Sequence, residues 1–175
     1  MDKKVQLKVF TLMAGHTHGS YNLVLQEVGG IRKIPIIVGT FEAQAIATEI
    51  EGITPQRPLT HDLLVAVLAG LDVELKEVLI YDLQNGVFFA RLLLHKAGLI
   101  SEIDARTSDA IAIALRTKSP IYIESHLNEK PSRPINSNDY SVYSKSELMT
   151  LLDEAVEAED YIKAALIRDE LNKSK

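Results

Sequence analysis

Hydrophobic residues along the first 125 positions recur with two different periods. Alternating or short continuous apolar runs, typical of β-strands, occupy residues 5–13, 21–28, 31–38, 73–83, 87–95, 98–103 and 121–123. Spacings of three and four residues, typical of one helix face, occupy residues 41–51, 63–71 and 110–116. Helices and hairpins are interspersed rather than strictly alternating. The pattern therefore predicts an α+β fold with a mixed, mainly antiparallel sheet and three helices.

Turn residues connect the expected strands. Gly29-Gly30 and Asn85-Gly86 each separate a pair of strand segments, and Asn-Gly is the strongest short signal for a two-residue hairpin. Pro35 lies inside the third strand segment, where its missing N–H predicts an edge position or a bulge.

Helix ends are marked as well. Thr40 and Thr60 are hydroxyl N-cap candidates, and Gly52 is placed to end the first helix. Asp62 lies in the first turn of the second helix, where the helix dipole favours a negative charge. The segment Asp104-Ala-Arg-Thr-Ser-Asp109 is expected to open the third helix.

The last fifty residues differ in character. Asparagine, serine and proline dominate residues 126–143 and no apolar period remains, which predicts a linker. Residues 144–175 carry two apolar stripes around an acidic segment, and either one long helix or a helical hairpin fits. So short a unit needs another copy or the main domain to cover its stripe. The expected parts are residues 1–125, 126–143 and 144–175.

Composition narrows the classes of protein. The chain is 46% hydrophobic, carries a net charge of -5 and contains no cysteine. It therefore has no global basic field to recruit nucleic acid, no disulfide and no thiolate site. No signal-peptide pattern and no membrane-length apolar run is present, so a soluble cytoplasmic protein is expected. His16 and His18 could begin a metal site, but no third ligand lies near them and a polar turn is favoured.

Three polar groups could carry chemistry. Glu42 and Glu49 share a helix face but lie roughly 10 Å apart along the axis, too far for one metal ion. Arg57, His61 and Asp62 form a denser group, in which arginine could clamp a phosphate and histidine could act as general acid or base. The same three residues also fit helix capping and a loop-fastening ion pair, and both interpretations stay open.

The third group is the segment 104–109. Capping by Thr107, Ser108 and Asp109, with Arg106 paired to an acid, is the favoured interpretation. A helix N-terminus with a hydroxyl and an arginine is also an anion site. Phosphodiester hydrolysis needs charge stabilisation, an activated water and usually a metal or an acid and base, which these groups could supply together. No P-loop, dinucleotide motif, nucleophile elbow or His-Glu-x-x-His helix occurs.

Four ordered motifs resemble the bifunctional nuclease family over roughly residues 1–125. They are Pro35–Ala47, Arg57–Leu63, Gly86–Leu92 and Ile103–Ala112. Thr107 stands where the family pattern Asp-Ala-Arg-Pro-Ser-Asp has proline, and both residues suit a helix start. The resemblance implies hydrolysis of DNA and RNA.

The tail is similar to the UVR motif, the helical hairpin by which bacterial excision-repair subunits contact one another. The similarity rests on Leu152, Ala155, Val156, Glu159–Tyr161, Ala164, Ala165 and Ile167–Asp169. It favours the hairpin over one long helix, and it implies a bacterial source and a protein contact, either with a homo-oligomer partner or with another protein.

These observations lead to one leading hypothesis. The chain is expected to be a nuclease acting on DNA or RNA, and the alternative is a non-enzymatic adaptor in stress response or repair. Magnesium or manganese is a possible cofactor, and no membrane partner is expected. The candidate catalytic residues are His61, Glu42, Asp62 and Asp104. The candidate substrate-binding residues are Arg57, Arg106, Ser108 and Gln44, and Asp109 is a candidate metal ligand.

Overall fold

The computed structural model describes residues 3–15, 19–128, 140, 145–157 and 160–173, without the side chains of residues 146, 147 and 173. Two compact units, residues 1–131 and 132–175, are each considered alone. His16 and His18, like most of the expected linker, lie outside the described residues.

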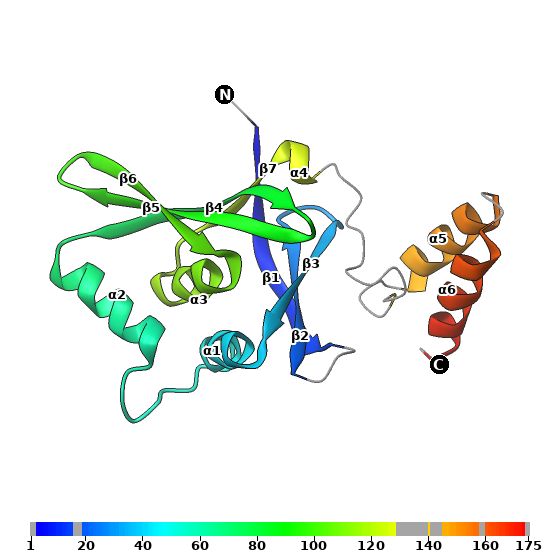
Figure 1. The fold of residues 1–175 in the computed structure, drawn as a ribbon, viewed down its shortest axis with the longest axis horizontal. Coiled ribbons are helices and arrows are strands. Elements are labelled where there is room, and N and C mark those ends of the chain that lie inside the picture. The colour runs from blue at the N-terminus through cyan, green and yellow to red at the C-terminus, as the bar shows by residue number, and fades with distance from the viewer. Residues whose placement is uncertain (1–2, 16–18, 129–139, 141–144, 158–159, 174–175) are drawn as a thin grey trace. The chain divides into compact units, whose positions relative to one another are not determined.

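The first unit is built on a seven-stranded sheet in the order β3-β2-β1-β7-β4-β5-β6 (Figure 1). All neighbouring strands are antiparallel except β4 and β7, which are parallel. The strands are β1 (Lys4–Ala14), β2 (Ser20–Glu27), β3 (Lys33–Gly39), β4 (Glu74–Gln84), β5 (Val87–Lys96), β6 (Leu99–Arg106) and β7 (Ile121–Glu124). The expected mixed, mainly antiparallel sheet is confirmed, and Pro35 lies on an edge strand as its missing N–H requires.

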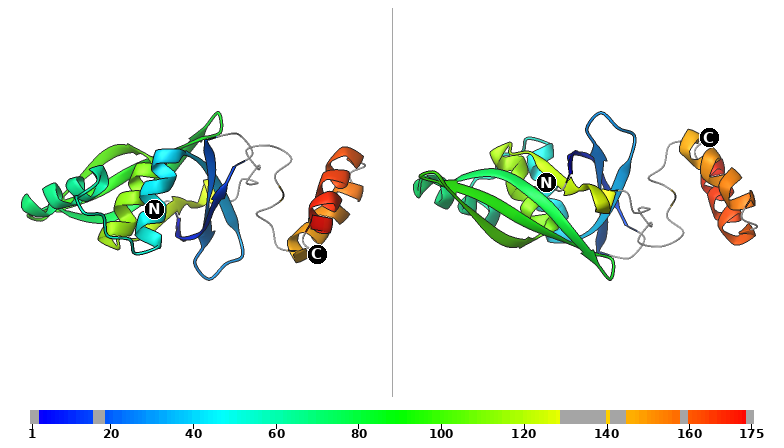
Figure 2. Two further views of the ribbon diagram at one scale, coloured as in Figure 1. Left: turned by 90° about the horizontal axis from the view of Figure 1, so that it is seen from below. Right: turned by 90° about the horizontal axis from the view of Figure 1, so that it is seen from above.

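Three helices lie on one side of the half-sheet β4–β5–β6, as the two views of Figure 2 show. They are α1 (Thr40–Ile50), α2 (Thr60–Gly70) and α3 (Thr107–Thr117), and α3 lies between the other two and contacts both. A four-residue helix, α4 (Ser125–Asn128), follows β7 and was not expected from the sequence. None of the described helices is long and apolar enough to cross a membrane.

The core of this unit lies between the sheet and helices α1 and α3. Alternate residues of the strands point into it, and Ala110, Ile111 and Ala114 of α3 are buried against them. Small alanines on α3 allow the helix to approach the sheet closely. Helix α2 differs, because none of its residues is buried.

Two-residue turns connect the long hairpins. Asn85 and Gly86 have φ values of 50° and 83°, and Gln84 pairs with Val87. The expected Asn-Gly hairpin is therefore confirmed, with the positive φ at both positions that a type I′ turn requires. Gly52 has a φ of 65° just after α1, where it ends the helix as expected.

Some expected element ends are wrong. Thr40 and Thr60 are the first helical residues rather than N-caps, and the caps are Gly39 and Leu59. Thr40 Oγ1 instead donates to the carbonyl oxygen of Gly19, and the Leu59 N–H donates to the carboxylate of Asp62. Asp62 thus does the capping from inside the helix, which is the reciprocal half of a capping box.

The start of the third helix is also later than expected. Strand β6 continues through Arg106, because residues 99–106 pair without interruption along β5, and α3 begins at Thr107. Asp104 and Arg106 are consequently strand residues on one face of β6, two positions apart. Alternation along a strand, rather than helix capping, sets where these two side chains point.

The second unit contains a helical pair. Helices α5 (Lys145–Glu157) and α6 (Tyr161–Lys173) pack against each other, so the hairpin is confirmed and the single long helix is wrong. Leu148, Ala155, Ala164 and Ile167 are buried in this unit together with Tyr140. The Asp160 side chain accepts a hydrogen bond from the Lys163 N–H and caps α6.

Candidate functional site

The first turns of three helices meet at the candidate site. Glu42 lies in the first turn of α1, His61 in that of α2 and Asp109 in that of α3, while Arg106 is the residue before α3. The four residues, here called the His61 cluster, are joined by hydrogen bonds between residues up to 64 positions apart. Helix N-termini carry partial positive charge, which stabilises the carboxylates and favours an added anion.

Arg106 is the centre of the His61 cluster. Its Nε donates to Asp109 Oδ2 at 2.7 Å, its second terminal nitrogen to Asp109 Oδ1 at 3.1 Å, and its first to Glu42 Oε1 at 2.7 Å. The hydrogen bonds to Asp109, followed by the one to Glu42, raise the pKa of the guanidinium above its ordinary value. The Arg106 side chain is nevertheless 67% exposed, so solvent reaches the cation.

His61 is held by the same aspartate. His61 Nε2 lies 3.1 Å from Asp109 Oδ1, and the two side chains are 16% and 27% exposed. Burial alone would raise the pKa of Asp109, but hydrogen bonds from Arg106 and His61 outweigh it and lower the pKa below its ordinary value. A carboxylate bonded to one ring nitrogen fixes the tautomer and orientation of the imidazole.

Asp62 belongs to a second pair beside the His61 cluster. Its Oδ1 accepts a hydrogen bond from Arg116 Nε, and the Arg116 side chain is only 5% exposed. Arg116 also donates to the carbonyl oxygens of Ala112 in α3 and Ala45 in α1. One buried guanidinium therefore ties the start of α2 to both neighbouring helices. The bond from Arg116, with that from the Leu59 N–H, lowers the pKa of Asp62.

Sequence reasoning missed Arg116. It lies seven residues after Asp109 and four after Ala112 on the same helix. Residues at that spacing share a helix face, so an arginine at the end of the apolar run 110–115, on the face of Asp109, was the available signal.

The other candidates lie outside this network. Asp104 Oδ1 accepts a hydrogen bond from Tyr81 Oη at 3.1 Å and pairs in register with Arg91. Arg57 is exposed in the segment between α1 and α2, and neither its side chain nor that of Ser108 has a hydrogen-bonding partner among the described residues. Gln44 is exposed on α1. The structure thus joins His61, Glu42, Arg106 and Asp109 and leaves these four candidates apart.

The carboxylates as placed do not fit a metal ion. Both oxygens of Asp109 accept hydrogen bonds from Arg106, Glu42 Oε1 faces Arg106, and both oxygens of Asp62 are already hydrogen-bonded. A divalent ion needs several oxygen atoms directed at one point. Over the described residues, no group of three or more His, Asp or Glu side chains is arranged to hold a metal ion.

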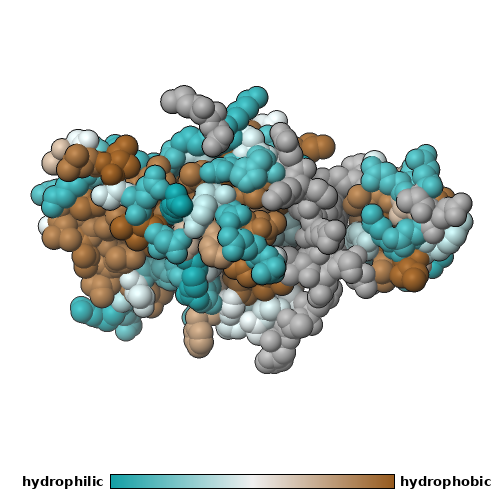
Figure 3. Space-filling view, turned by 45° about the horizontal axis from the view of Figure 1, so that its top comes forward, coloured by the Kyte–Doolittle hydropathy of each residue, from teal (hydrophilic) through white to brown (hydrophobic). Residues whose placement is uncertain are grey.

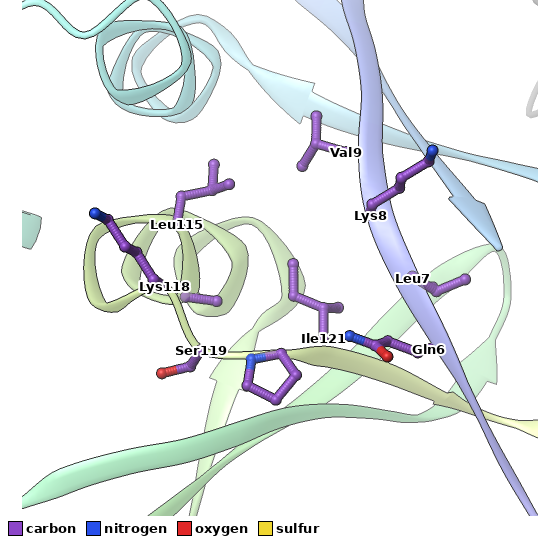
Figure 4. Close-up of a pocket in the computed structure, with 10 residues that line it drawn as sticks. Gln6, Leu7, Lys8, Val9, Leu115, Lys118, Ser119 and Ile121 are labelled. Atoms are coloured by element: carbon purple, nitrogen blue, oxygen red, sulfur yellow. The ribbon is translucent and has the colours of Figure 1, made fainter. Parts of the chain in front are cut away.

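A separate hollow lies on the same unit and contains none of these residues. It has a volume of about 390 Å³ and lies between β1, the end of α3 and the start of β7. Its floor is apolar, and Figure 4 shows Lys8 and Lys118 pointing in different directions rather than at a common ligand position.

Comparisons with known proteins show which sequences this chain resembles. A protein of Mycobacterium tuberculosis described as uncharacterized, matched in two strains, is 49% identical over 102 residues, which cover 58% of this chain and 60% of that protein. Bifunctional nuclease 1 of Arabidopsis thaliana is 26% identical over 165 residues, covering 79% of this chain and 51% of that protein. The chain therefore spans less than two thirds of the length of these relatives.

Two sequence families match different parts of the chain. The UvrB/uvrC motif matches residues 144–175, the part that contains α5 and α6. The bifunctional nuclease domain matches residues 23–136, which include all four residues of the His61 cluster. Because this match covers more than half of the chain, the protein belongs to the bifunctional nuclease domain family.

Proposed function

We propose that this protein hydrolyses phosphodiester bonds of DNA or RNA at the His61 cluster. The observation that carries the proposal is the chain of contacts from Glu42 through Arg106 and Asp109 to His61, at the meeting point of three helix N-termini. Family membership supports the reaction class, and the relative from Arabidopsis carries the name of a bifunctional nuclease.

Arg106 is suited to hold the scissile phosphate. A guanidinium has five N–H donors, and Arg106 uses one from each of its three nitrogens on Asp109 and Glu42. One donor therefore remains on each terminal nitrogen. These N–H groups can bind phosphate oxygens and stabilise the negative charge that develops during displacement at phosphorus.

His61 is suited to move the proton of the attacking water. Asp109 engages Nε2, so Nδ1 is the atom that would exchange a proton with substrate or water. In the proposed step, Nδ1 accepts a proton from water as its oxygen attacks phosphorus. The bond to the leaving oxygen breaks, and the proton returns to that oxygen. Asp109 keeps the ring oriented through both transfers.

Magnesium or manganese stays a prediction for the assay to test. The present placement of the carboxylates does not supply its ligands, so no step above depends on it. Arg57, Asp104, Ser108 and Gln44 stay predictions in the same way, with Arg57 and Gln44 exposed where an extended substrate could reach them.

The test is cleavage of labelled single-stranded DNA and RNA by the full chain, with magnesium, with manganese and with EDTA. The variants His61→Ala and Arg106→Ala are expected to lose at least about 100-fold in rate, as for a general base or an oxyanion donor. Lys4→Ala is the matched control, because Lys4 also pairs with an acid, Glu77, and neither residue is a candidate site residue. Cleavage that persists in both cluster variants would move the activity elsewhere.

A second candidate function has its own support. Every carboxylate in and beside the His61 cluster has a hydrogen-bonded partner, as expected if the network only fastens helices together. The UVR match suggests a protein-contact role for residues 144–175. If no condition gives cleavage, the non-enzymatic adaptor becomes the better hypothesis.

A further inference from the structure

Helix α2 exposes hydrophobic side chains to an extent that a stable monomer rarely shows. Residues 63–71 contain no charged and no polar side chain, yet none of them is buried. A helix that is apolar around most of its circumference is normally covered. Its exposed large side chains, with exposed fractions, are Leu63 59%, Leu64 40%, Val67 46% and Leu71 55%.

Strand β6 extends this apolar surface. Leu99 and Ile103 are 74% and 47% exposed. They lie on the same strand face as Ala105, which packs against the main core, and therefore on the side of the sheet that carries the helices. Figure 3 shows hydrophobic surface concentrated at the end of the unit formed by α2 and the β5–β6 hairpin.

The outer edge of β6 is open as well. β6 is the last strand of the sheet and pairs with β5 through eight residues without a bulge. It contains neither proline nor lysine, two of the usual protections of an edge strand, although Glu102, Asp104 and Arg106 place other charges on it. The opposite edge strand, β3, has both Lys33 and Pro35.

We propose that α2 and the edge of β6 form the interface with a second copy of this chain. In this homodimer, β6 pairs antiparallel with β6 of the other copy about a two-fold axis, and the apolar faces of the two α2 helices help to cover the junction. A two-fold interface uses the same surface on both copies. The second copy thus supplies a pairing strand for the open edge of β6 and an apolar face that covers α2.

The size of the patch fits this occupant. The six exposed side chains and Leu59 amount to an apolar area on the order of 700 Å², compared with roughly 800 Å² per partner in a standard interface. Monomeric proteins rarely expose a continuous apolar patch of that size.

The chemistry of the patch argues against other occupants. Nucleic acid requires cations, and residues 63–71 have none. An interfacial membrane helix has lysine or arginine on its polar face, whereas the polar start of α2 has His61 and Asp62 engaged with α3. The tail buries its main apolar stripe within its own unit.

The experiment measures the mass of the full chain by sedimentation velocity over a dilution series. The natural chain is expected at twice 19.4 kDa, and Val67→Lys is expected to weaken the dimer at least about tenfold. Ile103→Lys is a second interface variant that decides the outcome if Val67→Lys does not fold. Ile31→Lys is the matched control, because Ile31 is 80% exposed but lies between β2 and β3.

A variant in the tail distinguishes a dimer formed through α2 and β6 from a dimer formed through α5 and α6. Ile162→Lys alters a side chain that is 79% exposed on α6, and the dimer is expected to survive it. Hydrogen exchange of residues 99–106 should speed up on dilution and in the Val67→Lys variant. A monomer at every concentration would overturn the proposal, and so would a dimer that only Ile162→Lys abolishes. The readout is mass and exchange, so the result is independent of nuclease activity.

Discussion

At the scale of single residues, Arg116 determines how the start of α2 is held. Its guanidinium is almost fully buried and joins Asp62 to the backbones of α1 and α3. His61 is the residue before Asp62, so this pair also fixes the neighbouring imidazole near Asp109. A structural salt bridge therefore positions a candidate catalytic residue without touching it.

This pair predicts a pH dependence of stability. The pKa of Asp62 is lower in the folded chain, mainly because of the hydrogen bond from Arg116. Its contribution should be complete above the unfolded pKa of about 3.9 and be lost as pH falls through the folded value. Urea unfolding between pH 7 and pH 2 measures this contribution.

The variant Arg116→Met tests whether the Arg116–Asp62 pair causes this loss of stability in acid. It should lower the free energy of unfolding at pH 7 by about 3 kcal/mol, because it leaves Asp62 without its buried partner. It should also reduce the decline of the free energy of unfolding as the pH is lowered. Arg91→Met, at an exposed pair, is the control expected to change neither. An unaltered acid slope in Arg116→Met would mean that another group controls the decline.

At the scale of elements, the two hairpin turns of the half-sheet have the same backbone but different first residues. Asn85 and Gly86 have φ values of 50° and 83°, and Ala97 and Gly98 have 49° and 82°. Asparagine tolerates a positive φ better than alanine does. The sequence signal was strong at the first turn and weak at the second, although the chain folds identically at both.

This equivalence predicts opposite effects of reciprocal substitutions. Ala97→Asn should raise the free energy of unfolding by roughly 0.5–1 kcal/mol, and Asn85→Ala should lower it by a similar amount. Thermal unfolding of the two variants and of the double exchange measures both effects. If both substitutions shift the melting temperature in one direction, backbone strain at these positions is not the cause.

At the scale of the whole molecule, the chain has two separate hydrophobic cores. The sheet core and the α5–α6 core share no buried residue, and the chain divides between them near residue 131. A unit with its own hydrophobic core can fold and unfold on its own. The two units should therefore unfold separately.

The variant Ile167→Asp tests this independence. Ile167 is fully buried in the tail, so an aspartate there should unfold α5 and α6. Hydrogen exchange should become fast over residues 145–173, while the strand amides of residues 75–95 keep their protection. Loss of protection in both regions would mean that the two units are energetically coupled.

The sequence by itself determined the local structure and the family. The helix and strand periods, the Asn-Gly turn, the edge position of Pro35 and the tail hairpin all depend on residues that are near one another in the chain. The four motifs that resemble the bifunctional nuclease family agree with the domain that matches residues 23–136. The ends of the helices and strands were not determined in this way, since β6 continues three residues beyond the expected end at residue 103 and so changes where Asp104 and Arg106 point.

Only the tertiary structure decided which polar residues meet. The bonds that build the His61 cluster and its neighbouring pair join residues 48, 54 and 64 positions apart. No local spacing encodes such distances, because they follow from how α1, α2 and α3 pack on the sheet. The open apolar face of α2 is equally a tertiary result: its sequence indicates a buried helix, but α3 and β5 leave that face uncovered in a single copy of the chain.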